Sequence, residues 1–390
     1  MTVQQIYELT NTIFNEVTGG SAVLNEDLSN VVDCGNTIID NNMVDNFVKK
    51  LVDRIAKVNF VNRPYSGSVP SLYKDSFEYG SVVQKIYGAM PTATSSDEWK
   101  LENGKEYPTD IFYQPTVTNK FYNSKTAFRI NMSFATKQVK SAFGGAGELN
   151  AFLSMLTTNV DNAITIRVDE LIMRVIASMI VDTFHTAFNA ETNDYTTVGD
   201  TRCVNLLKLY NNRFGTTLTK DVAITSPEFI RFASFVMGIY KDRLTKMSKL
   251  FNIAGEDRFT KSSDLHVVAL ADFVESAKTY LYSNTYHENF VTLPDAETVP
   301  YWQGCGTSYD MGDIATINAK SGAGNSFNAN EAGVYILAIM FDNNAMGVSN
   351  ISREVTSGYN PNGNFYTNYY NVENSFWNDN TENFVVFYIA

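Results

Sequence analysis

Two stretches near the start of the chain place apolar residues at helical spacing. In residues 1–18 and about 42–59, apolar side chains recur every three or four positions, with polar side chains between them. This pattern predicts two short amphipathic helices. Gly19 and Gly20 end the first of them. Polar segments separate the helices, so we expect residues 1–65 to form an N-terminal arm and not a self-contained domain.

The longest helical pattern covers residues 147–189, where one face stays apolar throughout. An unbroken helix of about 42 residues would be roughly 63 Å long. Sustained heptads with flanking charges are missing, so the pattern favours a rod lying along a sheet over a coiled coil. The apolar positions expected to pack on that sheet include Leu149, Phe152, Leu156, Leu171, Val175 and Met179.

Alternation with a period of two marks an extended region at about 72–136. Residues 81–88 are predicted to form the first strand of a hairpin. Residues 125–136 are predicted to form the end of its second strand, with one face exposed to solvent. We expect the two to be the strands of one long hairpin loop. The residues expected to lie in these loop strands are Val83, Lys85, Phe128, Ile130, Met132 and Phe134.

The tip of this hairpin raises the question of what it lies against. Asn103 and Gly104 predict a type I′ turn, flanked by the opposite charges of Glu102 and Lys105. A two-stranded ribbon with so few apolar residues cannot readily offset its ordering entropy. It is either an ordinary surface hairpin on its own domain or an arm that lies on another subunit. The tip residues in question are Trp99, Lys100, Leu101, Glu102, Asn103, Gly104, Lys105 and Tyr107.

From about Cys203 the pattern becomes that of a compact α+β unit. Ser226 followed by Pro227 predicts a helix start, because Ser caps helices and Pro suits the first helical position. Short apolar runs at 265–270, 333–342 and 382–390 predict buried strands.

Composition narrows the class of protein. The chain has 390 residues, of which 44% are apolar, and a net charge of −12. That acidic balance argues against a protein whose main role is to grip nucleic acid. Its three cysteines are far apart, which fits a reducing compartment. The first residues lack a basic leader, and the most apolar run, 171–181, is short and contains Arg174. We therefore expect no signal peptide, no membrane span and synthesis in the cytosol.

The residues give no support to catalysis. None of the three histidines has a partner at metal-ligand spacing, and no nucleotide-binding or G-x-S-x-G pattern occurs. GGAG at 144–147 precedes a helix but lacks the lysine of a phosphate-binding loop. We expect no enzyme activity, no metal and no cofactor.

The order of elements, an arm, an extended hairpin, a very long helix, an α+β unit and a terminal strand, resembles the major capsid proteins of tailed bacteriophages, which have the Hong Kong 97 fold. The stretches DLHVVALADFVESAKTYL (264–281), ETVPYWQG (297–304) and YILAIMFDNNAMGV (335–348) also look like segments of such shells. The resemblance implies an arm at 1–65, a peripheral domain at 66–202 and 331–390, and an axial domain at 203–330. In it, residues 72–136 are the extended loop and 147–189 the spine helix.

The resemblance also implies a function. The chain would assemble as pentamers and hexamers into an icosahedral or prolate head shell around double-stranded DNA, with each extended loop on a neighbouring subunit. It would be assembled in the host cytoplasm and reside in the virion. Partners would include a portal and weakly contacted DNA, together with either separate scaffolding or decoration proteins or none. The arm lacks the charged coiled coil of a built-in scaffold, and Lys100 and Lys105 are expected to be solvated, not cross-linked.

Two other classes remain open on the sequence alone. An encapsulin-type nanocompartment shell protein would share the fold and would enclose a cargo enzyme. A secreted β-rich hydrolase or adhesin would account for the Asn-rich and aromatic C-terminal third, although the missing signal peptide counts against it.

Overall fold

The computed structural model describes residues 3–20, 23–26, 29–40, 43, 46–47, 50, 69–74, 83–91, 93, 100–107, 109–112, 114, 116–135, 138, 146–188, 194–282, 296–300, 302, 318–329 and 331–390. Its helices are α1 (Val3–Thr18), α2 (Val31–Asp40), the 3-10 turn η1 (Pro70–Leu72), α5 (Ala146–Ala187), α6 (Leu206–Phe214), α7 (Lys220–Ala223), α8 (Pro227–Leu244) and α9 (Ala271–Tyr282). Its strands are β1 (Tyr73–Lys74), β2 (Val83–Gly88), β3 (Val117–Tyr122), β4 (Lys125–Ala135), β5 (Cys203–Asn205), β6 (Leu265–Leu270), β7 (Ala296–Val299), β8 (Asn318–Lys320), β9 (Ser326–Asn328), β10 (Tyr335–Asp342), β11 (Met346–Asn360), β12 (Phe365–Asn378) and β13 (Phe384–Ile389).

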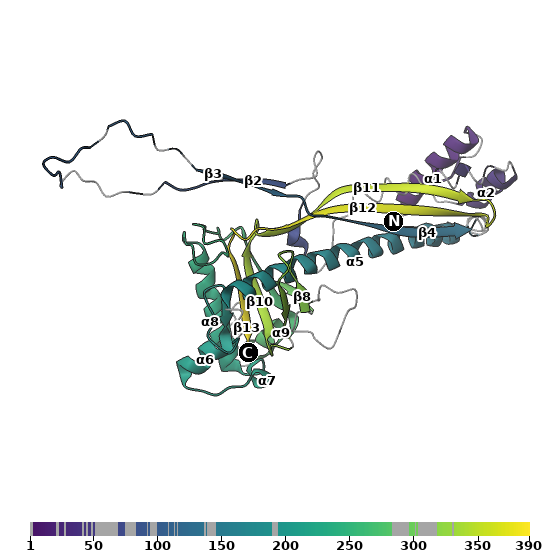
Figure 1. Cartoon of the computed structure of the whole chain (residues 1–390). Coiled ribbons are helices and arrows are strands. Elements are labelled where there is room, and N and C mark those ends of the chain that lie inside the picture. The colour runs from purple at the N-terminus through teal and green to yellow at the C-terminus, as the bar shows by residue number, and fades with distance from the viewer. Residues whose placement is uncertain are drawn as a thin grey trace.

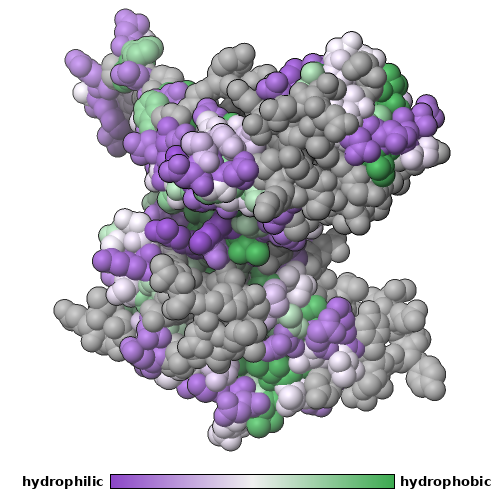
Figure 2. Space-filling model, turned by 90° about the vertical axis from the view of Figure 1, so that its right-hand side faces the viewer, coloured by the Kyte–Doolittle hydropathy of each residue, from purple (hydrophilic) through white to green (hydrophobic). Residues whose placement is uncertain are grey.

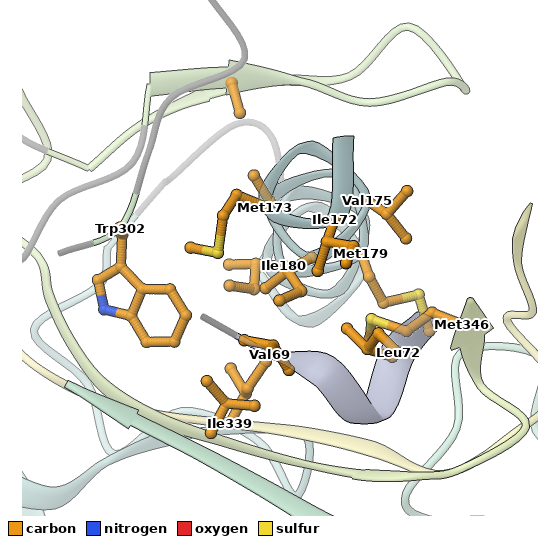
Figure 3. Packing of buried hydrophobic residues seen from close by; sticks show 14 of the residues in the cluster. Val69, Leu72, Ile172, Met173, Val175, Met179, Ile180, Trp302, Ile339 and Met346 are labelled. Atoms are coloured by element: carbon orange, nitrogen blue, oxygen red, sulfur yellow. The ribbon is translucent and has the colours of Figure 1, made fainter. Parts of the chain in front are cut away.

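The 42-residue helix α5 is the axis of the molecule and connects its two sheets (Figure 1). It begins and ends within two residues of the helix expected from the apolar pattern. Leu171, Val175 and Met179 are buried in the main apolar cluster. The side chains of Leu149, Phe152 and Leu156 lie outside the described residues. Around α5, the cluster brings together η1, β10 and the buried Trp302, whose indole N–H donates to the Ile336 carbonyl at 2.9 Å (Figure 3).

A five-stranded sheet with the order β5-β13-β10-β6-β7 forms the more compact part of the molecule. Its central strand β10 is antiparallel to both neighbours. Helix α5 covers one face of this sheet, and α6, α8 and α9 cover the other. Ile336, Ile339 and Phe341 join the α5 cluster, whereas Leu337, Ala338 and Met340 join the other cluster. Both faces of the sheet are therefore buried, which explains the continuous apolar run of β10.

The sheet topology corrects the expected division of the chain. Strands β10 and β13, from the segment 331–390, pair with β6 and β5, from the segment 203–330. Only β11 and β12 of that segment belong to the second sheet. Assigning all of 331–390 to the peripheral domain is therefore wrong. An apolar run predicts a buried strand, but it carries no information about which strand lies beside it.

The second sheet has four strands in the order β1-β11-β12-β4. Strand β4 pairs with β12 along its length, from Ala135 opposite Phe365 to Lys125 opposite Ser375. The apolar face of β4 packs on the main apolar cluster around α5 in the same chain. The prediction that Phe128, Ile130, Met132 and Phe134 form a loop strand is therefore wrong. Alternation correctly marks a strand with one buried face, but the partner is another strand of the same molecule.

The described part of the arm holds a small apolar core of its own. Phe14 in α1 contacts Phe47 with ring centroids 5.1 Å apart, and Ile13 and Ile38 are also buried. Helix α2 has no counterpart among the predicted helices. Most of the helix expected at 42–59 lies outside the described residues.

The β2–β3 ribbon leaves the body near the junction of the two sheets and projects away from it (Figure 1). The four-stranded sheet and the arm extend in the opposite direction. Viewed from that opposite side, the coloured surface intersperses hydrophilic residues with smaller apolar areas (Figure 2).

A close approach in β11 gives a first testable prediction. A Cβ added to Gly347 would lie 2.5 Å from Cζ2 of the Trp377 ring on the paired strand. Because Trp377 is buried and cannot move freely, Gly347→Ala should lower the free energy of unfolding by about 1–3 kcal/mol, as measured by urea denaturation. Gly358→Ala in the same strand is the matched control, since its nearest neighbour would be 3.9 Å away. Equal stability of the two variants would contradict the prediction.

Candidate subunit-assembly site

The candidate site is the assembly loop, which we define as β2, β3 and the residues between them (83–122). The strands pair from Val83 opposite Tyr122 to Gly88 opposite Val117. One further hydrogen bond, from the Ala89 N–H to the Thr116 carbonyl at 2.8 Å, closes the ladder. Every described residue from 89 to 116 is exposed. The expected extended loop at 72–136 is thus shorter in the structure, because β1 and β4 belong to the four-stranded sheet.

The tip of the assembly loop contains the expected turn, but of a different type. Gly104 has a φ of 89° and the Lys105 N–H donates to the Glu102 carbonyl at 3.3 Å, while Asn103 has no positive φ. These features define a type II turn, not type I′. No strands flank the turn, so the twist match that favours type I′ in hairpins does not apply. The Tyr107 hydroxyl accepts from the Glu102 N–H at 3.1 Å and supports the turn.

The two faces of the ribbon differ in chemistry. Ile86, Val117 and Phe121 lie on the outer face and are 60–65% exposed. In the open part of the loop, Leu101 is 68% exposed and Phe112 84% exposed. This row of apolar side chains has no cover from the described part of its own chain. Exposed apolar surface of this kind is typical of an interaction site.

The inner face of the ribbon is anchored by the buried carboxylate of Asp379, in the turn between β12 and β13. Its Oδ2 accepts from Lys85 Nζ at 3.0 Å and from the Tyr87 hydroxyl. Its Oδ1 accepts from the Thr381 hydroxyl at 2.7 Å and lies 3.7 Å from Lys120 Nζ. Both loop strands therefore attach to one fully buried charge. We call these five residues the anchoring cluster.

Electrostatics fix the protonation states of Asp379 and Tyr87 near neutral pH. Burial by itself would raise the pKa of Asp379, but the Tyr87 hydrogen bond, the Lys85 charge and the Thr381 hydrogen bond lower that pKa well below its usual range. Burial raises the pKa of the Tyr87 phenol, and its hydrogen bond to Asp379 adds to the effect. Asp379 is therefore ionised and Tyr87 neutral. This pairing suits a strong charge-assisted hydrogen bond.

Further contacts fix the loop base at the junction of the two sheets. Lys85 Nζ also donates to the Asn344 carbonyl, in the turn between β10 and β11. The Arg258 guanidinium lies 4.6 Å from the centroid of the Tyr87 ring, and its Nε lies 3.9 Å from Glu382. The direction in which the loop projects is therefore set by turns that connect one sheet to the other.

The depressed pKa of Asp379 predicts how the anchoring cluster responds to acid. A folded-state pKa below the unfolded value of about 3.9 means that the carboxylate stabilises the fold above that value and loses this effect as the pH falls toward the folded-state pKa. The difference in unfolding free energy between the native chain and Asp379→Asn should stay constant from pH 7 to about 4.5 and shrink below it. Burial, the Asp342 charge and, to a lesser extent, the Asp379 charge raise the pKa of Glu382, so both chains are compared in a Glu382→Gln background that removes this titration. A difference that already shrinks between pH 7 and 5 would contradict this assignment.

The structure places the predicted loop residues in two groups. Lys100, Leu101, Glu102, Asn103, Gly104, Lys105 and Tyr107 are all exposed at the tip, and Trp99 lies outside the described residues. Val83 and Lys85 are half-buried at the base. Sequence reasoning missed Asp379, because one carboxylate in an Asn-rich turn carries no signal that two lysines and a tyrosine converge on it from nearly 300 residues away.

We also searched the described residues for a metal site, a reactive cysteine and a membrane-spanning helix. Among the described residues, no group of three His, Cys, Asp or Glu side chains could hold a metal ion. Burial raises the pKa of the Cys203 thiol well above its usual value, so this thiol is unreactive. Within the described part of the chain, no helix has the length and apolar character that a membrane crossing needs.

Comparison with known proteins decides the family. A family model described as the Phi29-like phage major capsid protein matches residues 10–388. The chain belongs to this family. A curated relative of this Phi29-like capsid protein, the major capsid protein of Bacillus phage GA-1, is 25% identical over 167 residues, which cover 41% of this chain. The match spans only 34% of the relative's length.

The fold of this Phi29-like capsid protein is also found in a solved structure. A chain in the structure of head fiber and inner core protein gp22 of native bacteriophage P68 is 12% identical, with a TM-score of 0.52 over 84% of this chain and 86% of that one. A chain in the capsid structure of Staphylococcus phage Andhra is also 12% identical, with a TM-score of 0.48 over 85% and 86% of the two chains.

These findings confirm the α+β Hong Kong 97-type fold and the expectation of a major capsid protein, a component of the virion head. They give no support to an encapsulin-type shell protein or to a secreted hydrolase or adhesin. Membership in a structural family also implies a role other than catalysis.

Proposed function

We propose that this Phi29-like capsid protein assembles through its projecting loop into the head shell that encloses the double-stranded DNA genome of a tailed phage. The observation that carries the proposal is the assembly loop itself. It projects from the body with an exposed apolar outer face and a rigidly anchored base. A second copy packed against that outer face would remove it from water, which is the main driving force for association.

The shell requires many modest contacts and not one strong contact. Each copy in a closed shell engages several neighbours, so the contacts act together. We infer pentamers and hexamers, with residues 203–330 near their axes. Assembly would take place in the host cytoplasm, with a portal and separate scaffolding or decoration proteins as partners.

The acidic composition supports weak contact with the packaged genome. With a net charge of −12, the chain has few cations to spare for phosphates. Strong and cumulative phosphate contacts would hinder packing and release of DNA. A strongly basic inner surface in an assembled shell would contradict this part of the proposal.

The direct test is expression of the chain, alone and with scaffolding protein, followed by negative-stain imaging. We expect closed shells, or rings of five or six copies. Monomers under every condition would overturn the proposal.

A further inference from the structure

A second exposed patch lies outside the assembly loop, on α6 and α8. The Arg213 guanidinium lies 6.0 Å from the ring centroid of Phe214 and 5.8 Å from those of Phe232 and Phe235. Phe214 and Phe235 are 55% and 52% exposed, whereas Phe232 is buried. We call these four residues the aromatic patch. Aromatic residues and arginine are the types that dominate binding energy at protein interfaces.

The patch is held in shape before any partner binds. Tyr210 contacts Phe214 at 4.9 Å between ring centroids and Phe232 at 5.6 Å. Phe214 and Phe232 contact each other at 5.7 Å. The exposed Phe214 ring is therefore one side of a packed aromatic cluster. A side chain already fixed in place loses little entropy when a partner covers it.

The position of the patch indicates what covers it. Helices α6 and α8 lie on the side of the body toward which the assembly loop projects (Figure 1). A copy held beneath that loop would therefore face the patch. Helix α9 packs on α8, β6 and β7, so it lies beyond α8 at the sheet edge opposite β5 and α6. The two flanks of the five-stranded sheet are thus different surfaces, as a head-to-tail contact requires.

Charge favours contact between these two flanks. Helices α6 and α8 together carry five basic and two acidic residues, whereas α9 carries two acidic residues and one basic residue. Of the α9 charges, Lys278 is paired with Glu275 at 2.6 Å, and Asp272 is exposed in the first turn. An aspartate facing Arg213 would complete a cation held between a carboxylate and aromatic rings.

We infer that the aromatic patch binds the α9 flank of an adjoining copy, with Asp272 facing Arg213. This inference rests on the proposed shell function and names the surfaces that meet beneath the loop. Each copy offers the patch on one side and α9 on the other, so repetition of the contact generates a ring where the rotation between copies closes, as in the pentamers and hexamers of the proposed shell.

The first test replaces Phe235 with Glu, which places a carboxylate in the patch. We expect the yield of shells, measured by sedimentation and negative stain, to fall at least about tenfold, the loss typical of a disrupted interface anchor. Leu250→Glu is the matched control, because Leu250 is 58% exposed and lies outside α6, α8 and α9; this variant should assemble like the native chain. Circular dichroism and urea unfolding of each variant show whether the fold is intact. Normal shells from a folded Phe235→Glu variant would overturn the inference.

The second test is a charge exchange that identifies the partner surface. Arg213→Glu and Asp272→Arg should each lower the yield, and the double variant should restore it, because every interface then contains the reversed pair. Arg213→Glu combined with Glu256→Arg has the same net charge but should not restore assembly, since the exposed Glu256 lies outside both flanks. Equal rescue by both double variants, or rescue by neither, would overturn the assignment of α9.

These outcomes are separable from failure of the proposed function. If the native chain assembles and all patch variants assemble equally well, the shell function stands and the inference fails. If the native chain never assembles, the proposed function fails first. If Phe235→Glu blocks only binding of a scaffolding protein to preformed rings, the patch belongs to that partner and not to a second copy.

Discussion

Deletion of residues 95–107 is expected to abolish shells and to leave soluble rings or aggregates. The deletion removes the exposed tip, including Leu101, but leaves the paired strands and the anchoring cluster intact. Because no described residue of the open part of the loop is buried in its own chain, the loss should fall on assembly and not on folding. Negative-stain imaging and a thermal unfolding curve of the same preparation measure the two effects separately.

The matched control for this deletion keeps the loop and changes only its lysines. Lys100→Arg with Lys105→Arg retains both charges and removes both primary amines. We expect normal shells, because these side chains are exposed and expected to be solvated. Normal particles from the deletion variant would remove the role assigned to the loop. Shells that form only with both lysines present would instead indicate a covalent link through an amine.

Asp379→Asn is expected to lower the free energy of unfolding by about 3 kcal/mol, because removal of one partner from a buried ion pair leaves the other charge uncompensated. Lys85 and Lys120 retain 17% and 35% side-chain exposure, so the expected loss is at the lower end of the usual range. The loop base should also open more often. Urea denaturation measures the first effect, and faster amide hydrogen exchange in β2 and β3 measures the second.

Glu373→Gln is the matched control for this variant. Glu373 lies 3.7 Å from Lys125, and both side chains are more than a third exposed. Exposed pairs contribute less than about 1 kcal/mol. If the two variants lose equal stability, or if exchange in β2 stays unchanged in Asp379→Asn, the anchoring role of Asp379 is wrong.

Local patterns predicted elements better than they predicted pairing. The helix at 146–187 was predictable because its apolar face persists over many turns, so a few misplaced residues do not hide it. Strand β4 was predictable as a strand for the same reason. Its partner was not, because Phe128 pairs with Val372, and no local feature distinguishes that strand from β2.

The same distinction between local pattern and long-range pairing applies to the candidate site. The exposed tip could be predicted from its lack of apolar residues, which is a property of composition. The anchoring cluster could not, because it depends on the fold bringing the β12–β13 turn against both loop strands. The aromatic patch could not be predicted from the sequence for another reason. Phe214 and Phe235 fit the helical spacing of core residues, and only the structure shows that their side chains are exposed.

The pairing of β4 with β12 also affects the nascent chain during translation. Residues 125–135 meet partners that are translated about 240 residues later. At about 5–20 residues per second, synthesis of that interval takes roughly 10–50 s. During it, the apolar side of β4 and part of α5 have no sheet to cover them, so each nascent chain is open to aggregation long before it can meet another copy. We therefore expect slower translation, or depletion of chaperones, to lower the number of usable subunits that a cell obtains.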